Sequence, residues 1–329
     1  MVCDGLMVAL NLYMMVTNFI GENRMKKIII FGGSGFIGQN LARTLLIQDY
    51  EVYIVSRNKP KDCVGLFTQW DAQTLGDWTA LLEESEAIVN LVGRSVDCIK
   101  TAETIDEILR SRVDSTLLIG KALKRLKVQP KTWVQMSTAH RYGDALDVVC
   151  TEESTFGYGM APYVGKMWER AYEEVVPKEM KQVIVRTSFV LGKEGGALQR
   201  MASLASWGLG GTLGHGKQGI SWIHADDMSA LLLRAIENDR MKGVYITSAP
   251  NPVSNAEFMK KLRTSLNVKI GLPAFSWMVK IGAPLLMNTD PELALYGRYC
   301  VSARLKDEGF EFSYPTLDEA FDDIFEERT

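Results

Sequence analysis

The sequence predicts an α/β fold, a doubly wound parallel sheet followed by a smaller, mainly helical C-terminal lobe. Apolar strand-like runs alternate with helical patterns up to about residue 250. This alternation is typical of a parallel sheet that is covered by helices on both faces. Beyond residue 250 the alternation stops and helix-start signals follow one another, which indicates a separate helical region.

Six apolar runs are expected to form the sheet. Helical patterns such as Ile105–Leu126 and Met167–Val175 lie between them. Because the runs are apolar along their whole length rather than alternating, both faces of the sheet should be buried. The expected strands are Lys27–Phe31, Val52–Ser56, Ala87–Val92, Thr132–Met136, Val183–Val190 and Val244–Thr247.

The turn after the first run predicts a dinucleotide site of the Rossmann type. The segment Phe31-Gly-Gly-Ser-Gly-Phe-Ile-Gly38 spaces its glycines three apart, between a strand and a helix pattern that begins near Leu41. Glycines admit a pyrophosphate close to the backbone, and the helix N-terminus offers it free N–H groups. This context favours the dinucleotide over an ordinary glycine-rich turn. The expected contacts are Gly32, Ser34, Gly35, Phe36, Ile37 and Gly38.

The end of the second strand favours NADP over NAD. An acidic residue there would accept hydrogen bonds from the ribose hydroxyls of NAD, but this chain has Ser56 and Arg57, followed by Lys59 and Lys61. A hydroxyl and cations suit a 2'-phosphate. The alternative is a solvated basic loop. After the 87–92 strand, Asn90, Leu91, Val92 and Gly93 are expected to line the adenosine side of the cofactor.

Composition excludes several other classes of protein. The 329 residues are 47% hydrophobic and 23% charged, as in ordinary globular proteins. The net charge of −3 lacks the positive field that nucleic-acid binding requires. Five cysteines without a C-x-x-C pair and three scattered histidines indicate neither disulfides nor a metal site. We therefore expect a cytoplasmic protein with a small-molecule substrate and no membrane partner.

The first 24 residues are predicted to be a leader that precedes the folded domain. The apolar stretch Leu6–Ile20 is interrupted by polar residues and is too short to span a bilayer. It also lacks the basic region of a secretory signal. Our hypothesis is that translation begins at Met25; the alternative is a short membrane- or partner-binding helix.

The second half predicts a cleft loop and a C-terminal lobe. The glycine-dense stretch 208–219 is expected to be a loop, and the segment 192–224 a wall over the substrate cleft rather than a second phosphate cradle. Asp226 or Asp227 is expected to cap the helix that contains Leu231–Ile236. The domains predicted are thus 25–250 for the cofactor and 251–329 for the substrate.

Helix signals organise the predicted lobe. Ser254 with Glu257, and Thr316 with Glu319, have capping-box spacing, so helices should begin there and run toward Leu266 and Ile324. Prolines should break the middle of the lobe into short pieces. The apolar segment 273–287, with Trp277, would line a cleft or a subunit contact, which leaves the oligomeric state open. The prolines concerned are Pro273, Pro284 and Pro291.

Across residues 26–250 the chain resembles the extended short-chain dehydrogenase/reductases, the sugar-epimerase-like superfamily. Ser137–Asp144 resembles the family's serine/threonine motif, and Trp222–Asp226 its late strand-to-helix signature. More narrowly, the chain is similar to an atypical branch of epimerase-family proteins with a C-terminal domain of unknown function. The segments that carry this narrower likeness are 111–113, 195–198, 208–211, 249–252 and 309–312.

The resemblance implies a catalytic group that this chain matches only in part. Thr138 matches the residue that orients the substrate oxygen. The family's tyrosine and lysine stand four apart, whereas Tyr163 and Lys166 stand three apart, which changes their relative angle on a helix from about +40° to about −60°. If the register is instead anchored at Glu169, the two positions fall on Ala161 and Gly165. The alternative to a catalytic role is that Tyr163 and Lys166 belong to an exposed turn of a helix.

Other residues of the motifs are candidates for the substrate. The resemblance places His140, Tyr142, Trp222 and His224 near it, and either histidine could supply a proton. Arg112 stands where the family usually has an asparagine. Ile220 stands where sugar epimerases often carry a phosphate-binding arginine, which disfavours a nucleotide-sugar epimerase.

The resemblance favours an NADP(H)-dependent oxidoreductase or epimerase-like enzyme that acts on a small carbonyl or hydroxyl compound. The alternative is a catalytically silent NADP-binding protein that senses redox state or serves as a scaffold. The sequence identifies neither the substrate nor the direction of the reaction.

Overall fold

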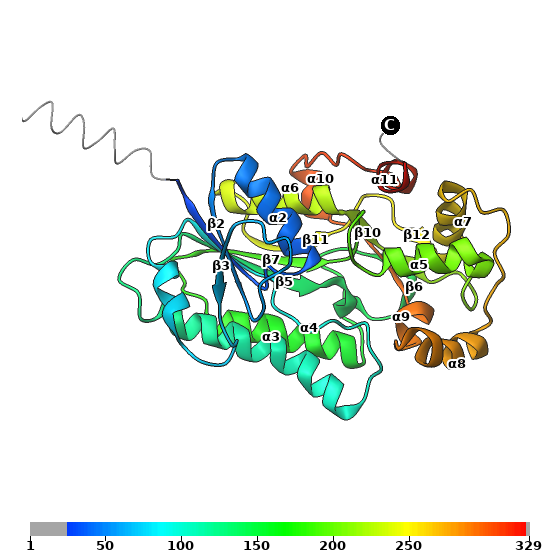
Figure 1. Cartoon of the computed structure of the whole chain (residues 1–329), viewed down its shortest axis with the longest axis horizontal. Coiled ribbons are helices and arrows are strands. Elements are labelled where there is room, and N and C mark those ends of the chain that lie inside the picture. The colour runs from blue at the N-terminus through cyan, green and yellow to red at the C-terminus, as the bar shows by residue number, and fades with distance from the viewer. Residues whose placement is uncertain (1–24, 327–329) are drawn as a thin grey trace, which may run out of the picture.

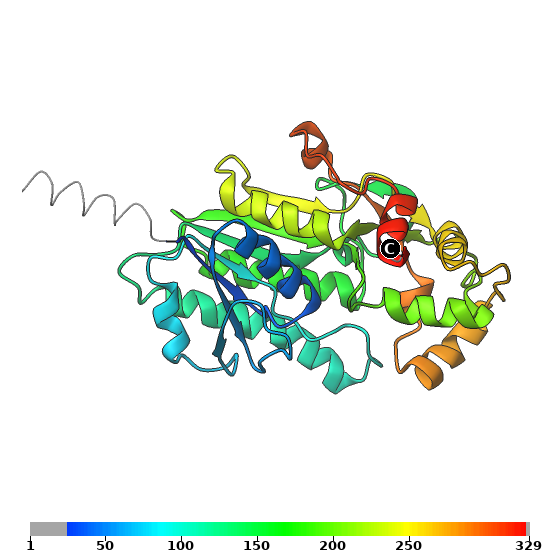
Figure 2. The same cartoon turned by 45° about the horizontal axis from the view of Figure 1, so that its top comes forward.

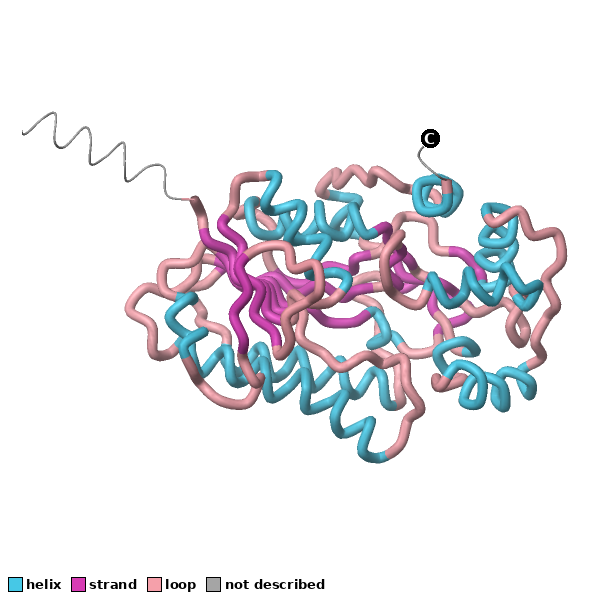
Figure 3. Tube along the Cα trace, in the orientation of Figure 1, coloured by secondary structure: helices cyan, strands magenta, loops and turns pink. Residues whose placement is uncertain are grey.

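Seven parallel strands form the central sheet of the computed structural model, which describes residues 25–326 (Figures 1 and 3). The leader hypothesis concerns residues outside this range. The strand order is β11-β7-β5-β4-β1-β2-β3. Because the order reverses at β1, which pairs with β2 on one side and β4 on the other, a crevice is expected at the carboxyl ends of these strands. The strands are β1 (Lys27–Phe31), β2 (Glu51–Ser56), β3 (Leu66–Gln69), β4 (Ala87–Asn90), β5 (Thr132–Thr138), β7 (Lys181–Thr187) and β11 (Gly243–Thr247).

Helices cover both faces of the sheet (Figure 1). Helices α2 (Phe36–Ile47) and α6 (Ala225–Glu237) pack together on one face, and α3 (Ala102–Leu123) and α4 (Met160–Val175) on the other. Two apolar cores lie between these helices and the sheet. In strand β1, Ile28 and Ile30 are fully buried in the core beneath α2 and α6, and Ile29 is fully buried in the core beneath α3 and α4. Burial of each such side chain stabilises the fold by about 1.5–3 kcal/mol. The predicted doubly wound class is confirmed.

Two features of the sheet differ from the expectation. The run Val183–Val190 is not one strand, because β7 ends at Thr187 and β8 (Phe189–Leu191) pairs instead with β10 (Trp222–His224). Strand β3 was not predicted, since none of its four residues is buried.

A third apolar core is formed by helices that lie beyond the carboxyl ends of the strands (Figure 2). Helices α5 (Leu198–Leu204), α7 (Asn255–Ser265) and α11 (Leu317–Phe325) surround the fully buried Trp222. The helix starts confirm the sequence signals, because Ser254 caps α7 and Thr316 forms a complete capping box with Glu319. The expectation for Pro284 is wrong: this proline lies inside helix α8 (Ser276–Met287).

The last part of the chain returns to the first domain. Strand β13 (Arg298–Cys300) pairs in parallel with β6 (Ala145–Cys150). Helix α10 (Ala303–Asp307) follows, and the next residue, Glu308, contacts β11. Its Oε1 accepts a hydrogen bond from the Tyr245 hydroxyl at 2.7 Å. The remaining elements are η1 (Asp77–Leu82), η2 (Ala139–Tyr142), η3 (Ala205–Leu209), β9 (Gly219–Ile220), β12 (Val253–Ser254) and α9 (Glu292–Leu295). Within residues 25–326 no helix is both long and apolar enough to cross a membrane.

Candidate functional site

The glycine turn is packed so closely that Gly32 and Gly38 leave no room for a side chain. Gly32 has φ +71°, and a Cβ there would lie 3.0 Å from the backbone of Leu91. A Cβ on Gly38 would lie 2.5 Å from Gly33 Cα. Ser34 and Gly35 are exposed, and no side chain of the described residues caps α2 at Gly35. The positive end of α2 is therefore accessible to an anion.

Ser56 and Arg57 lie at the carboxyl end of β2, next to this turn. Ser56 is buried and its hydroxyl donates to the Asn58 carbonyl at 2.9 Å, while the Arg57 side chain is exposed. Gln69 Nε2 donates to the Arg57 carbonyl at 3.0 Å. A shallow surface pocket lies beside Arg57. The sequence did not predict it, because most of its residues lie at the end of β3 and directly after it, and β3 itself was not expected. It is lined by Arg57, Gln69, Trp70, Asp71, Thr74, Gly76, Asp77 and Trp78.

The turn after β4 is shaped by a buried amide. Asn90 is fully buried; its Nδ2 donates to Gln135 Oε1 at 3.0 Å, and its Oδ1 accepts the Val92 N–H at 3.1 Å. These bonds hold the backbone of Leu91 and Val92 against Gly32. Leu91 and Val92 are partly exposed and Gly93 is exposed, so they, rather than Asn90, offer surface to a ligand.

The loop that begins at residue 192 reaches the glycine turn. A Cβ on Gly192 would come 2.6 Å from the Phe36 ring, and Gly195 lies beside the same ring. Arg43 of α2 forms a surface ion pair with Glu194 at 3.3 Å. The cleft loop therefore borders the predicted cofactor site at Phe36.

Thr138 is the last residue of β5 and lies at the carboxyl edge of the sheet. It is half-buried, and its Oγ1 accepts the His140 N–H at 3.1 Å. His140 is also half-buried. Tyr142 is buried; its hydroxyl accepts a hydrogen bond from Arg186 Nη1 at 2.9 Å, and burial raises the pKa of Tyr142 to about 12.

A buried ionic network fixes helix α4 against the sheet. Glu169 accepts hydrogen bonds from Ser137 Oγ at 2.5 Å and from Arg186 Nε and Nη2, both at 2.9 Å. Arg141 also forms an ion pair with Glu169. Charges that are buried need such pairing. The network therefore sets which residues of α4 face Thr138.

With α4 held in this way, Gly165 is a residue of this helix that faces Thr138. A Cβ on Gly165 would lie 3.1 Å from Thr138 Cγ2 and 2.5 Å from Arg141 Cγ. Tyr163 is instead 54% exposed, and Lys166 is exposed as well. The structure does not bring Tyr163 and Lys166 together with Thr138, so their catalytic role remains a prediction.

Trp222 and His224 make internal contacts. Trp222 has no exposed surface, and its Nε1 donates to the Asn251 carbonyl at 3.1 Å. His224 is the N-cap of α6, because its Nδ1 accepts the Asp226 N–H at 3.2 Å. The expectation that Asp226 or Asp227 caps this helix is wrong. Asp227 instead accepts the Ser313 N–H at 2.7 Å. Contact of Trp222 and His224 with substrate remains a prediction.

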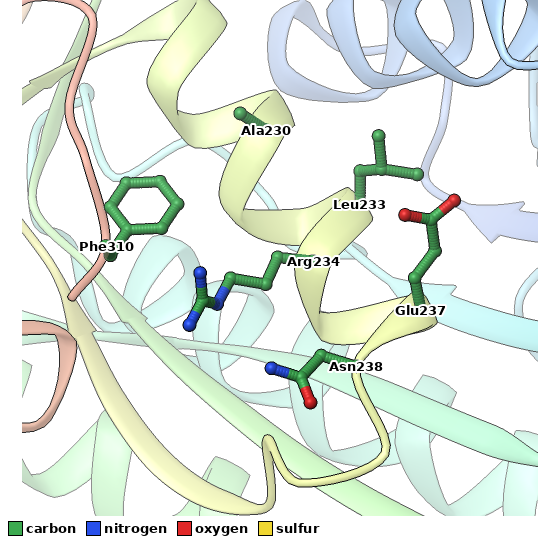
Figure 4. A pocket seen from close by; sticks show the side chains of 6 residues that line it. All are labelled: Ala230, Leu233, Arg234, Glu237, Asn238 and Phe310. Atoms are coloured by element: carbon green, nitrogen blue, oxygen red, sulfur yellow. The ribbon is translucent and has the colours of Figure 1, made fainter. Parts of the chain in front are cut away.

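Another pocket lies on α6, at a distance from these residues (Figure 4). It is lined by Ala230, Leu233, Arg234, Glu237, Asn238 and Phe310. Lys181, the first residue of β7, donates to the Asn238 carbonyl at 3.1 Å, so this end of α6 lies at the amino edge of the sheet. The site-bearing carboxyl edge is the opposite one.

Strand order, glycine turn and the Thr138 position together define an α/β protein of the extended short-chain dehydrogenase/reductase type. The chain belongs to the NAD dependent epimerase/dehydratase family, which matches residues 28–246. A domain of unknown function, DUF1731, matches residues 274–324.

Similar proteins cover nearly the whole chain. Epimerase family protein YfhF of Bacillus subtilis is 30% identical over 92% of this chain and 98% of its own length. Human epimerase family protein SDR39U1 is 30% identical over 91% of this chain and 99% of its own length. A crystal structure of the human protein with NADPH has a TM-score of 0.81 and covers 91% of this chain and 98% of that one.

Proposed function

We propose that this protein is an NADP(H)-dependent oxidoreductase or epimerase-like enzyme that acts on a small carbonyl or hydroxyl compound. The observation that supports the proposal is the glycine turn before α2, in which Gly32 packs against the backbone of Leu91. The similar human protein, crystallised with NADPH, supports the choice of cofactor.

The residues at the crevice fit this cofactor. Gly32, Gly35 and the first turn of α2 would hold the pyrophosphate, and exposed Arg57 would hold the 2'-phosphate. Leu91, Val92 and Gly93 offer surface on the adenosine side. When bound, the nicotinamide exchanges a hydride with a carbon of the substrate.

Thr138 would bind the substrate oxygen. Its Oγ1 already accepts a hydrogen bond from the His140 backbone, so the hydroxyl hydrogen is free to be donated. Such a donation stabilises negative charge that develops on the oxygen. His140, two residues further on, is our candidate for the group that exchanges the proton.

The second candidate function is a silent NADP-binding sensor or scaffold. It is favoured by one observation: Gly165 faces Thr138, while Tyr163 and Lys166 lie on the exposed side of α4. A protein without turnover would still bind the cofactor at the glycine turn.

NADPH oxidation in the presence of a panel of carbonyl compounds tests the proposal. With any compound that reacts, Thr138→Val should lower turnover by about 10²-fold, because it removes one hydrogen-bond donor to the reacting oxygen. Tyr163→Phe is the matched control on α4 and should cause only a modest loss. NADPH affinity, measured by fluorescence titration, should be unchanged in both variants. Loss of turnover in Tyr163→Phe alone would contradict this assignment, and no turnover across the panel would favour the sensor.

A further inference from the structure

Basic side chains from separate elements lie in the region that follows Thr138. His140 lies in η2, Arg112 in α3, Arg298 in β13, and Lys100 in the segment before α3. Burial and the positive charges of Arg298, Lys100 and Arg112 together lower the pKa of His140 well below its ordinary value. Two of these cations, Arg112 and Arg298, are held in place by hydrogen bonds to backbone carbonyls.

Arg112 is held with one edge of its guanidinium toward the end of β4. Its Nη1 donates to the carbonyls of Arg94 and Ile108, both at 3.0 Å, and its Cζ lies 5.0 Å from the centre of the Trp168 ring. The edge with Nε and Nη2 faces Gly93, whose Cβ, if present, would lie 2.9 Å from Cζ. Within residues 25–326 this edge makes no hydrogen bond, so it can bind a ligand.

Arg298 is brought to the same region by the return of the chain. Its Nε donates to the Gly143 carbonyl at 2.6 Å, and the Gly143 N–H bonds the His140 carbonyl at 3.0 Å. The nearby Asp144 carboxylate accepts the Gly297 N–H at 2.8 Å. The two η-nitrogens of Arg298 make no hydrogen bond with the described residues.

Arg112 and Arg298 differ from two other arginines near Thr138 in that they have no carboxylate partner among the described residues. Arg141 and Arg186 both form ion pairs with Glu169, as buried charges normally do. Arg112 and Arg298 form no ion pair with any carboxylate of residues 25–326, although the charge of Asp144 acts on Arg298. The Lys100 ammonium donates to the carbonyls of Val96 and Cys98. Burial alone lowers the pKa of Arg112 to about 10. A chain with a net charge of −3 thus concentrates unpaired positive charge at one place.

We propose that Arg112 and Arg298 bind a compact anionic group, a carboxylate or a phosphate, that the substrate carries next to its reacting carbon. The inference rests on the proposed function, because it assigns the substrate class of the same site. The planar forks of the two arginines suit the paired oxygens of either group. The α2 N-terminus and Arg57 are left for the phosphates of the cofactor.

Calorimetry on the NADP⁺-loaded protein tests this without turnover, because the oxidised cofactor can neither reduce nor oxidise a ketone that carries no hydroxyl group. Two matched pairs of such ketones serve as probes: pyruvate against methyl pyruvate, and hydroxyacetone phosphate against methoxyacetone. In at least one pair the anionic member should bind about 10-fold or more tightly than the neutral one. The pair with the larger preference distinguishes a carboxylate from a phosphate.

Variants assign that preference to the cluster. Arg112→Gln and Arg298→Gln should each weaken binding of the anion about 10-fold to 100-fold. Arg110→Gln should leave it unchanged, since Arg110 lies on the same helix but is exposed and paired with Asp114 at 3.2 Å. Two substitutions are used so that a folding defect in one of them does not decide the result.

The outcomes separate this inference from the proposed function. Failure of NADP⁺ to bind would contradict the proposed function. Normal cofactor binding without an anion preference, or with one that both variants retain, would overturn the inference alone. The inference would also be overturned if Arg112→Gln weakens NADP⁺ binding and leaves the affinity for the anionic probe unchanged. The Arg112 guanidinium would then bind the cofactor and not the substrate.

Discussion

At the scale of single residues, the charged side chains near Thr138 have two distinct roles. Glu169 pairs with Arg141 and Arg186 and holds α4 in place. Arg112 and Arg298 have no such partner among the described residues. We infer that the first set stabilises the fold, whereas the second set is available for a ligand.

The Glu169 network predicts a large effect on stability. Glu169→Gln should lower the free energy of unfolding by about 3–5 kcal/mol, because it leaves two buried guanidinium groups without a countercharge. Glu173→Gln, an exposed position on the same helix, should change it by less than about 0.5 kcal/mol. Urea denaturation of both variants measures the difference. Equal stability would show that the network does not hold α4.

Some residue roles followed from the sequence and others did not. Anchoring the register at Glu169 places Gly165 at the family's lysine position, and Gly165 is the residue that faces Thr138. The cap of α6 was predicted from residue preference, which favours aspartate, but His224 occupies the cap. The partners of Glu169 come from β5, η2 and β7, and no local pattern predicts an ion pair between distant segments.

At the scale of elements, local signals were the most reliable. The caps at Ser254 and Thr316 were predicted because the bonding groups lie three residues apart. Pro284 was expected to break a helix, but α8 lies on the surface, where water can bond the Lys280 carbonyl that the proline leaves unpaired. Strand β3 was missed because an edge strand with little burial has no apolar pattern.

The close packing of helix α2 against the glycine turn predicts that a side chain at Gly38 lowers stability. Gly38→Ala should destabilise the protein by about 1–3 kcal/mol, because the new Cβ would press on Gly33 at 2.5 Å and push α2 from the turn. Gly35→Ala is the matched control, since its Cβ meets Gly32 O at 3.6 Å, an ordinary contact. Thermal unfolding compares the two variants. Similar midpoints would mean that α2 is not packed on the turn as described.

At the scale of the whole molecule, the candidate site is assembled from both ends of the chain. The glycine turn and Arg57 come from the first βαβ unit, Thr138 and His140 from β5 and η2, and Arg298 from a strand that returns to β6. The sequence predicted the first part, since its signals are local. It could not predict the approach of Arg298 to Gly143, because the two residues are 155 positions apart in the chain.

NADP(H) is expected to bind at the crevice between β1, β2 and β4, and titration with the two reduced cofactors measures this binding. Tryptophan fluorescence should show NADPH binding at least about tenfold more tightly than NADH, since charge-assisted bonds to the 2'-phosphate contribute about 1.5–3 kcal/mol each. Arg57→Ala should remove most of that preference. Lys178→Ala, which removes an exposed cation between α4 and β7, should retain it. Equal affinity of the unaltered protein for NADPH and NADH would contradict the account.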